Sequence, residues 1–191
     1  HPGLPMLGLG MDFSSSLQLP PQAGQGPKLL FYPGSSIGNF TPEDALVFLR
    51  QARQACAGGG LLIGVDLLKP RALLEPAYDD ALGVTAAFNH NLLLHLNALV
   101  GSNFQPGDWQ HVAFFNDTAS RIEMHLQALR AVDVRWPGGE RHFAEGERIH
   151  TENSYKWLQG DFAQLLQSAG FASTQAWTDE RGWFAVFWAA A

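Results

Sequence analysis

The sequence predicts an α/β fold in which a parallel sheet is packed on both faces and interrupted by an inserted α+β subdomain. Two short apolar segments, at 28–32 and 61–66, flank a segment with helical spacing of apolar residues. A strand, helix, strand order with fully apolar strands is typical of a parallel sheet covered by helices. The character of the chain changes after about residue 70 and then returns to a helix and two aromatic strands. We therefore predict a partial core at 1–70, an inserted subdomain at 71–157, and a C-terminal helix and β-hairpin at 158–191 that complete the core.

The predicted core places two loops where a ligand would bind. The first strand ends at Pro33, and Thr41 is a good N-cap for the helix that follows, with Pro42 at the first helical position. The glycines at 58–60 are expected to end that helix. Asp66 closes the second strand. Because ligands of open α/β sheets bind at the carboxyl ends of the strands, we expect a site at the loops 34–39 and 66–69.

The inserted subdomain begins with a helical pattern and continues as short strands. We expect helical structure over 73–99, a segment that carries several asparagines among leucines and alanines. Four short segments with intervening turn residues then indicate an antiparallel meander, namely 111–115, 121–126, 131–135 and 142–143. In the last portion we expect a helix at 160–169, stopped by Gly170, and two strands at 174–178 and 183–188.

Composition excludes several classes of function. The chain has 191 residues and a net charge of −6, from 12 basic and 18 acidic residues, with no cluster of Lys and Arg. This composition argues against binding of nucleic acid. A single cysteine, Cys56, cannot build a disulfide framework or a cysteine metal site, which suits the cytoplasm. No apolar run approaches the roughly 18 to 20 residues that span a bilayer, so we expect no membrane partner.

The segment 34–38 matches the G-x-S-x-G pattern of a nucleophile elbow. With Asp66 and His150 downstream, Ser36 would even complete the Ser, Asp, His order of α/β-hydrolases. The helix start at Thr41 argues against this hypothesis, because the serine of a true elbow stands on the strand-to-helix turn itself. The spacing is equally compatible with a flexible loop that brings Asn39 to a small ligand and with a plain β-to-α connection.

A second polar segment, 149–156, is the part of the chain densest in titratable side chains. If it is extended, Glu152 and Ser154 share one face and could both bind one heterocycle; a solvated loop is the alternative. We interpret Glu123 as a solvent-facing carboxylate, with Met124 facing the core or a pocket. The seven histidines have no zinc-site spacing, so we interpret them as structural and predict no metal site.

Four segments, taken in order, resemble the histidine Nα-methyltransferases of ergothioneine biosynthesis. The resemblance covers 2–188 and rests on four stretches of sequence: Gly34 to Phe40; Ala77 to Asp80 with Gly83 to Asn89; Arg121 to Met124; and Thr151 to Lys156. It implies the C-terminal part of a class I methyltransferase (Rossmann-like) sheet with an inserted α+β substrate-binding subdomain. It also implies S-adenosylmethionine as cofactor and L-histidine as substrate, methylated stepwise to trimethylhistidine.

The resemblance implies roles for individual residues. Asp12 and Phe13 match a pair that contacts the adenine end of the cofactor, and Gly34 is grouped with them. Substrate binding is implied for Asn39 and Tyr78, which match residues that hold the backbone groups of the amino acid, and for Glu152, Asn153 and Ser154, of which the first and last match residues that bind the imidazole. Met124 together with Glu152 resembles the pattern selective for histidine over a tryptophan derivative. No residue is identified as the base for the amine, and solvent or a tyrosine could serve.

The chain departs from the family pattern at its front. The glycine-rich cofactor loop, the acidic residue for the ribose and an N-terminal helical segment with a further tyrosine do not occur in it. Together with a start at His1, this leads us to expect an N-terminally truncated chain that could self-associate through exposed apolar strand edges. Two alternatives remain open: a serine hydrolase that uses Ser36, and a non-catalytic module that binds an amino acid.

Overall fold

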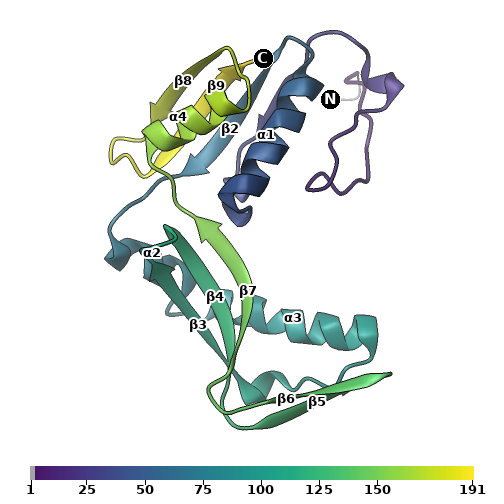
Figure 1. The fold of residues 1–191 in the computed structure, drawn as a ribbon, viewed down its shortest axis with the longest axis vertical. Coiled ribbons are helices and arrows are strands. Elements are labelled where there is room, and N and C mark those ends of the chain that lie inside the picture. Colours follow the sequence, from purple (N-terminus) through teal and green to yellow (C-terminus); the bar gives the residue numbers. More distant parts are fainter. Residues whose placement is uncertain (1–2) are drawn as a thin grey trace. The chain divides into compact units, whose positions relative to one another are not determined.

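The computed structural model describes residues 3–191, which form two compact units (Figure 1). Unit 1 comprises the chain up to Leu67 together with Leu158–Ala191, and unit 2 comprises Leu68–Trp157. His1 and Pro2, on which part of the expectation of a truncated start rests, lie outside the described residues. No helix of the described chain is both long and apolar enough to cross a membrane.

Unit 1 is a mixed four-stranded sheet with helices against it. The strand order is β1-β2-β9-β8, with β1 parallel to β2 and the remaining neighbours antiparallel. This arrangement contains the β-α-β unit of a Rossmann-like α/β fold and confirms the predicted parallel pair. The elements are η1 (Pro21–Ala23), β1 (Leu29–Tyr32), η2 (Ser36–Asn39), α1 (Pro42–Cys56), β2 (Gly60–Asp66), α4 (Gln159–Ser168), β8 (Ser173–Thr178) and β9 (Phe184–Ala190).

Helix α1 begins where its capping residues predict. The side-chain oxygen of Thr41 accepts a hydrogen bond from the backbone N–H of Asp44 at 3.1 Å, and Pro42 occupies the first helical position. The helix ends at Cys56, with Ala57 in the left-handed region at φ 49°, slightly before the glycines that were expected to stop it. One face of α1 is buried against the sheet through Ala45, Phe48, Leu49, Ala52 and Cys56.

The predicted C-terminal helix and hairpin complete the core of unit 1. Helix α4 lies beside α1 on the same side of the sheet (Figure 1). Phe162 of α4 packs on Phe187 of β9 with ring centroids 5.1 Å apart, and both side chains are fully or almost fully buried. Strand β9 therefore attaches the hairpin to β2 through backbone pairing and to α4 through aromatic packing.

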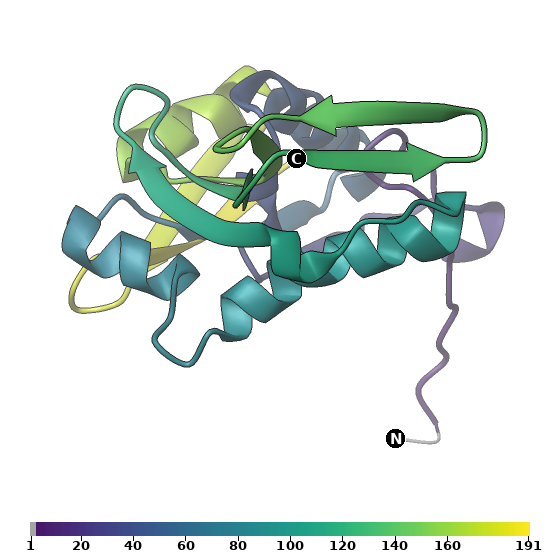
Figure 2. The same cartoon turned by 90° about the horizontal axis from the view of Figure 1, so that it is seen from below.

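Unit 2 is an antiparallel three-stranded sheet, two helices and a separate β-ribbon (Figure 2). The sheet order is β3-β4-β7, and β5 pairs with β6 alone. Leu93 of α3 is buried among Trp109, Leu126 and residues of the ribbon, which places the main core of unit 2 between helix, sheet and ribbon. The elements are α2 (Arg71–Tyr78), α3 (Val84–Val100), η3 (Pro106–Asp108), β3 (Trp109–Asn116), β4 (Arg121–Ala128), β5 (Val132–Trp136), β6 (Gly139–Phe143) and β7 (Arg148–Tyr155).

The helical segment expected over 73–99 forms two helices, which are separated at 79–83. The carboxylate of Asp80 accepts hydrogen bonds from the backbone N–H groups of Val84 at 3.1 Å and Thr85 at 2.8 Å. These bonds satisfy the first donors of α3 and lower the pKa of Asp80 to about 2. Gly83 supplies the left-handed conformation just before α3, so the break is encoded by a cap and a glycine.

The two faces of the β3-β4-β7 sheet carry different side chains. Met124, Glu152 and Ser154 lie on one side of the sheet, which we call the Met124 face, and α2 and α3 pack against this side. The other side, which we call the Glu123 face, carries Glu123, His125, His150 and Asn153. Cα pairing matches Met124 with Glu152 and His125 with His150, so Thr151 is an extra residue and forms a β-bulge. The Thr151 hydroxyl donates to the Met124 carbonyl at 2.9 Å.

The expectation of a simple meander is only partly correct. Strands β3 and β4 are neighbours, but β5 and β6 leave the sheet and β7 returns to pair with β4. Residues 148–155 are therefore a strand, and the alternative of a solvated loop is wrong.

Candidate functional site

Three polar side chains meet on the Met124 face of unit 2. Tyr78 stands at the last position of α2, Ser154 lies near the end of β7, and Lys156 follows directly after that strand. The Tyr78 and Ser154 hydroxyl oxygens are 2.7 Å apart, and the Lys156 Nζ donates to Tyr78 Oη at 2.7 Å and to Ser154 Oγ at 2.8 Å. We call Tyr78, Ser154 and Lys156 the Tyr78 trio. Its hydrogen bonds join residues that are more than 70 positions apart in the sequence.

A buried network holds the end of α2 in place. His111 Nε2 donates to the Tyr78 carbonyl at 2.8 Å, which leaves Nδ1 to accept from the Asn89 amide at 3.0 Å. The same amide donates to the His125 carbonyl at 3.1 Å. Asn89 is fully buried, so its N–H groups need hydrogen-bond acceptors within the protein. The bonds of this network connect α3, β3 and β4 to α2, the helix that carries Tyr78.

Glu152 and Met124 lie beside the trio. They are direct cross-strand partners, and Glu152 and Ser154 are two residues apart on one face of β7. Met124 is buried with Leu74 of α2 and Phe115 of β3. Burial raises the pKa of the Glu152 carboxyl, and the nearby charge of Lys156 opposes this effect. The Met124 face therefore offers an acceptor, a pair of hydroxyls and an apolar wall.

Asn153 is not brought together with Glu152 and Ser154. It lies opposite Glu123 in the β4–β7 pairing and so belongs to the Glu123 face. Within the described residues its Oδ1 is buried without a hydrogen-bond partner.

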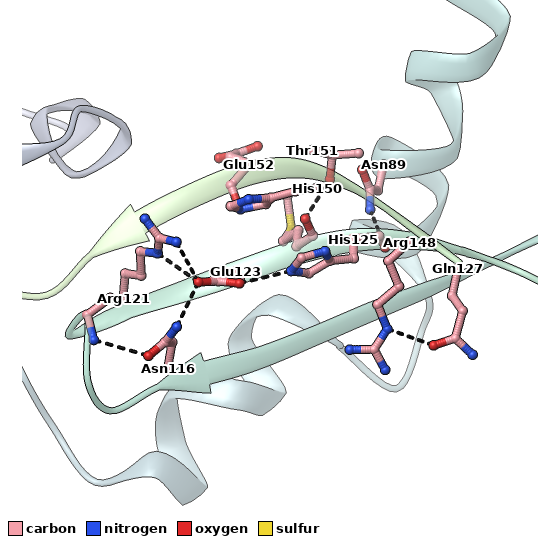
Figure 3. Close-up of polar contacts among 12 residues, drawn as sticks. Asn89, Asn116, Arg121, Glu123, His125, Gln127, Arg148, His150, Thr151 and Glu152 are labelled. Carbon is pink, nitrogen blue, oxygen red and sulfur yellow. Dashed lines mark hydrogen bonds and ion pairs between the residues drawn. The ribbon is translucent and has the colours of Figure 1, made fainter. Parts of the chain in front are cut away.

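The interpretation of Glu123 as a solvent-facing carboxylate is wrong, because the residue is only 7% exposed. Arg121 donates to its Oε1 through Nε at 2.8 Å and Nη2 at 2.7 Å, and His125 Nε2 donates to Oε2 at 3.0 Å (Figure 3). Asn116 also donates to Oε1 at 2.9 Å. Burial disfavours ionisation, but these hydrogen bonds outweigh it and lower the pKa of Glu123 to about 2.

Glu123, His125 and His150 have the ligand types of a metal site. Their ligand atoms lie within 4.8 Å of one another, and His125 Nδ1 is buried without a partner among the described residues. However, Arg121 already neutralises the carboxylate, and the two imidazoles are stacked face to face with centroids 4.5 Å apart rather than converging on one point. We interpret this group as an internal charge network.

The other predicted residues lie in unit 1. Ser35 Oγ accepts from the backbone N–H of Asp66 at 2.7 Å, so the loops 34–39 and 66–69 meet at the carboxyl ends of β1 and β2 as expected. Asn39 is the last residue of η2 and is exposed. A Cβ atom added at Gly34 would have no described atom within 4 Å. Ser35 rather than Ser36 has the positive φ, at 60°, and α1 begins six residues after Ser36, which departs from the geometry of a nucleophile elbow.

Asp12 and Phe13 fit the nucleoside end of a cofactor. Phe13 packs edge-on against Tyr32 and Phe48 with centroids 6.0 and 6.2 Å away. Hydrogen bonds from the side chain and backbone of Ser14 hold the exposed Asp12 carboxylate and lower its pKa. An aromatic ring and a carboxylate on consecutive residues are suited to a flat apolar base with polar edges. An apolar hollow of about 300 Å³ adjoins the ring and is lined by Leu9, Met11, Phe13, Leu17, Leu19, Leu30, Phe31, Tyr32, Phe48 and Leu61.

Sequence reasoning missed Lys156 and the buried pair Asn89 and His111. Lys156 was within reach, because it lies two residues after Ser154 and four after Glu152, and an extended chain places alternate side chains on one face. The contacts of Asn89 with His111 and His125 join residues 22 and 36 positions apart, and no local pattern indicates them.

Comparisons of the sequence with known proteins identify a family. The profile of the family described as histidine-specific methyltransferase, SAM-dependent, matches residues 1–191. The chain is 38% identical to the histidine N-alpha-methyltransferase of Mycolicibacterium smegmatis over 189 residues, and 38% identical to that of Mycobacterium tuberculosis over 182 residues. These alignments cover 97% and 94% of this chain but only 58% and 56% of the relatives.

Among solved structures, the CcbJ methyltransferase from Streptomyces caelestis aligns with a TM-score of 0.47 and 14% identity, covering 95% of this chain and 62% of that one. The sequence matches carry the assignment: over its whole length, this chain belongs to the family of histidine-specific, S-adenosylmethionine-dependent methyltransferases.

Proposed function

We propose that this chain forms the substrate-binding part of an enzyme that methylates the α-amino group of L-histidine to trimethylhistidine, the first step of ergothioneine biosynthesis. Membership of the family supports the reaction class. The observation that carries the substrate is the Met124 face, where Glu152, Ser154 and Tyr78 come together beside a buried apolar wall. A half-buried carboxylate next to hydroxyl groups is suited to a small polar ring such as imidazole.

Each of these side chains has a role in the proposal. Glu152 accepts the imidazole N–H, Ser154 faces the other ring nitrogen, and Tyr78 with Asn39 holds the backbone groups of the amino acid. When bound, S-adenosylmethionine supplies an electrophilic methyl group, for which Asp12, Phe13 and Gly34 are the proposed contacts. The protein side chains align the neutral amine for in-line attack and exclude water, and the sequence names no base.

Selectivity for histidine depends on the Glu152 carboxylate as a hydrogen-bond acceptor. Glu152 presents oxygen atoms whose desolvation is offset only if an N–H group meets them, because a buried acceptor left unpaired is costly. Met124 is the cross-strand neighbour of Glu152 and supplies an apolar side chain next to it. Together they support histidine over a tryptophan derivative, whose indole would meet the acceptor from a different position.

The test is mass spectrometry of L-histidine incubated with S-adenosylmethionine and the intact protein that contains this chain. We expect stepwise addition of up to three methyl groups. Glu152→Gln is expected to lower kcat/KM by about 10- to 100-fold, the effect of losing one charge-assisted hydrogen bond. Glu140→Gln, on the exposed β5–β6 ribbon, is the matched control and should leave kcat/KM unchanged.

The outcomes separate the open alternatives. Absence of any methylated product from the intact protein, with histidine still bound, would favour a non-catalytic amino-acid-binding module. Absence of both binding and product would remove histidine as the substrate. A serine hydrolase would require covalent labelling of Ser36 by a fluorophosphonate, which we do not expect.

A further inference from the structure

Lys156 is a buried lysine whose contacts lie inside the candidate site. Only 3% of its surface is exposed, although lysine is almost never this buried unless its charge is paired or hydrogen-bonded. Its backbone is fixed in both directions, because its N–H donates to the Ser120 carbonyl and its carbonyl accepts from the Ser120 hydroxyl, each at 2.8 Å. The ammonium lies 4.7 Å from the centroid of the Tyr78 ring. The position of this charge is therefore set by the fold.

The hydrogen atoms of the Tyr78 trio can be assigned from chemistry. An ammonium group only donates, so both hydroxyl oxygens act as acceptors toward Lys156. Each hydroxyl still carries one proton. One of the two O–H groups is used in the 2.7 Å contact between Tyr78 and Ser154. The other O–H cannot point at the ammonium and must point away from the trio. The trio therefore presents a hydrogen-bond donor to whatever lies against it.

Glu152 provides the opposite polarity on the same face. Its carboxylate accepts and does not donate when ionised, and it lies two residues from Ser154 along β7. The face thus presents one donor and one acceptor side by side. A neutral imidazole has the complementary pair, one nitrogen with a lone pair and one N–H. An imidazolium has two N–H groups and a pyrrole ring has no lone-pair nitrogen, so each would leave the donor of the trio unpaired.

We propose that Lys156 is a positioning residue, which forces one hydroxyl of the Tyr78 and Ser154 pair to donate away from the trio and thereby makes the site specific for the neutral imidazole of histidine. This inference rests on the proposed function and adds to it the residue that sets the polarity of the ring-binding face. Lys156 acts through the two hydroxyls and need not touch the substrate.

Binding measurements on Lys156→Met test the proposal. Methionine keeps much of the length of the side chain and removes the donor. We expect the Kd for L-histidine to rise about tenfold, as for one lost hydrogen bond, while the Kd for the analogue β-(pyrrol-2-yl)-L-alanine changes less than threefold. The histidine KM should rise more than kcat falls. Lys156→Arg, which keeps donors at the same place, should recover part of the difference between the two ligands.

A matched control and two contrary results define the test. Lys28→Met removes a lysine of unit 1 whose Nζ donates to the nearby Gly26 carbonyl, and it should not alter either Kd. Equal weakening of both ligands by Lys156→Met would mean that the lysine only supports the fold and would overturn the proposal. Unchanged affinity for both ligands would overturn it as well.

A measurement on the unaltered protein keeps the proposal testable if the variant does not fold. The ring nitrogens of ¹⁵N-labelled L-histidine report by NMR whether the bound ring is neutral or an imidazolium. We expect one protonated nitrogen and one nitrogen that accepts a hydrogen bond. A bound imidazolium would contradict this inference alone, whereas failure of histidine to bind would contradict the proposed function and the inference together.

Discussion

Glu123 shows how a single side chain organises one face of a sheet. Its carboxylate receives hydrogen bonds from Arg121, Asn116 and His125, and two of these donors carry or can carry a positive charge. Burial lowers the pKa of His125, and the neighbouring charges of His150 and Arg148 act in the same direction, against the carboxylate. The face is therefore held by an ionised glutamate and a neutral histidine near pH 7.

We expect Glu123→Gln to destabilise the protein by about 1 to 3 kcal/mol at pH 7, since it leaves Arg121 without its charged partner. The pKa of Glu123 is lowered to about 2, so the contribution is complete above its unfolded pKa and is lost as the pH falls toward 2. Urea denaturation at pH 7 and pH 3 measures this effect. The difference between the two proteins should shrink at pH 3, and an equal difference at both values would contradict the assignment.

The sequence alone could not reveal the state of Glu123. An acidic residue between Ile122 and Met124 in a strand indicates an alternating pattern, in which the polar side faces solvent. Burial arises because Arg121 lies two residues away on the same face and Asn116 and His125 also reach the carboxylate. By contrast, the shared face of Glu152 and Ser154 followed from strand periodicity alone, once the segment was taken as extended.

At the scale of elements, strand β2 depends on a close approach between backbones. A Cβ atom at Gly64 would lie 2.2 Å from the Pro33 carbonyl oxygen, which is part of the chain leaving β1. Distances this short do not occur between non-bonded atoms. Only glycine fits here, so this position couples β2 to the loop that precedes Asn39.

We expect Gly64→Ala to lower the free energy of unfolding by about 1 to 3 kcal/mol, because the strand or the loop must move to relieve the contact. Gly26→Ala is the control, since no atom lies within 4 Å of its Cβ position. Thermal unfolding of both variants is the measurement. Equal melting temperatures for the two would show that the approach of Pro33 is not rigid.

The elements that the sequence predicted best are those with local signals. Helix α1 was set by Thr41 and Pro42 at its start. The break before α3 was missed because it depends on the Asp80 carboxylate reaching backbone groups four and five residues ahead. The return of β7 to β4 across the ribbon was missed because strand pairing is not a local property.

At the scale of the whole molecule, the outer edge of unit 1 is open. Within the described residues no strand pairs with the free side of β1, and Phe31 on that strand is 66% exposed. Such an edge is a template for pairing with another chain. We expect the isolated chain to self-associate and Phe31→Lys to reduce this, as measured by sedimentation velocity. A monomeric isolated chain would contradict the expectation.

The chain enters and leaves unit 2 at two residues that lie next to each other. The backbone N–H of Leu68 donates to the Trp157 carbonyl at 3.0 Å, so the first and last residues of the unit are hydrogen-bonded. Because the ends already meet, unit 2 should keep its fold without the rest of the chain.

We expect a fragment of residues 68–157 to fold on its own. Its core contains Leu93, Trp109, Leu126 and Phe143, which are buried within the unit. A dispersed ¹H–¹⁵N NMR spectrum and cooperative thermal unfolding would support this expectation. A spectrum typical of a disordered chain would show that unit 2 needs unit 1 to hold its ends together.

The bulge at Thr151 has a consequence for comparing distant relatives. His150 and Glu152 are two residues apart and would share a face in a regular strand, but the extra residue sends them to opposite sides of the sheet. A homologue without that residue would have to place its alignment gap at Thr151. Shifting the gap by one position would align the counterpart of His150 or of Glu152 with Thr151, and that side chain would then be compared with a residue of the bulge.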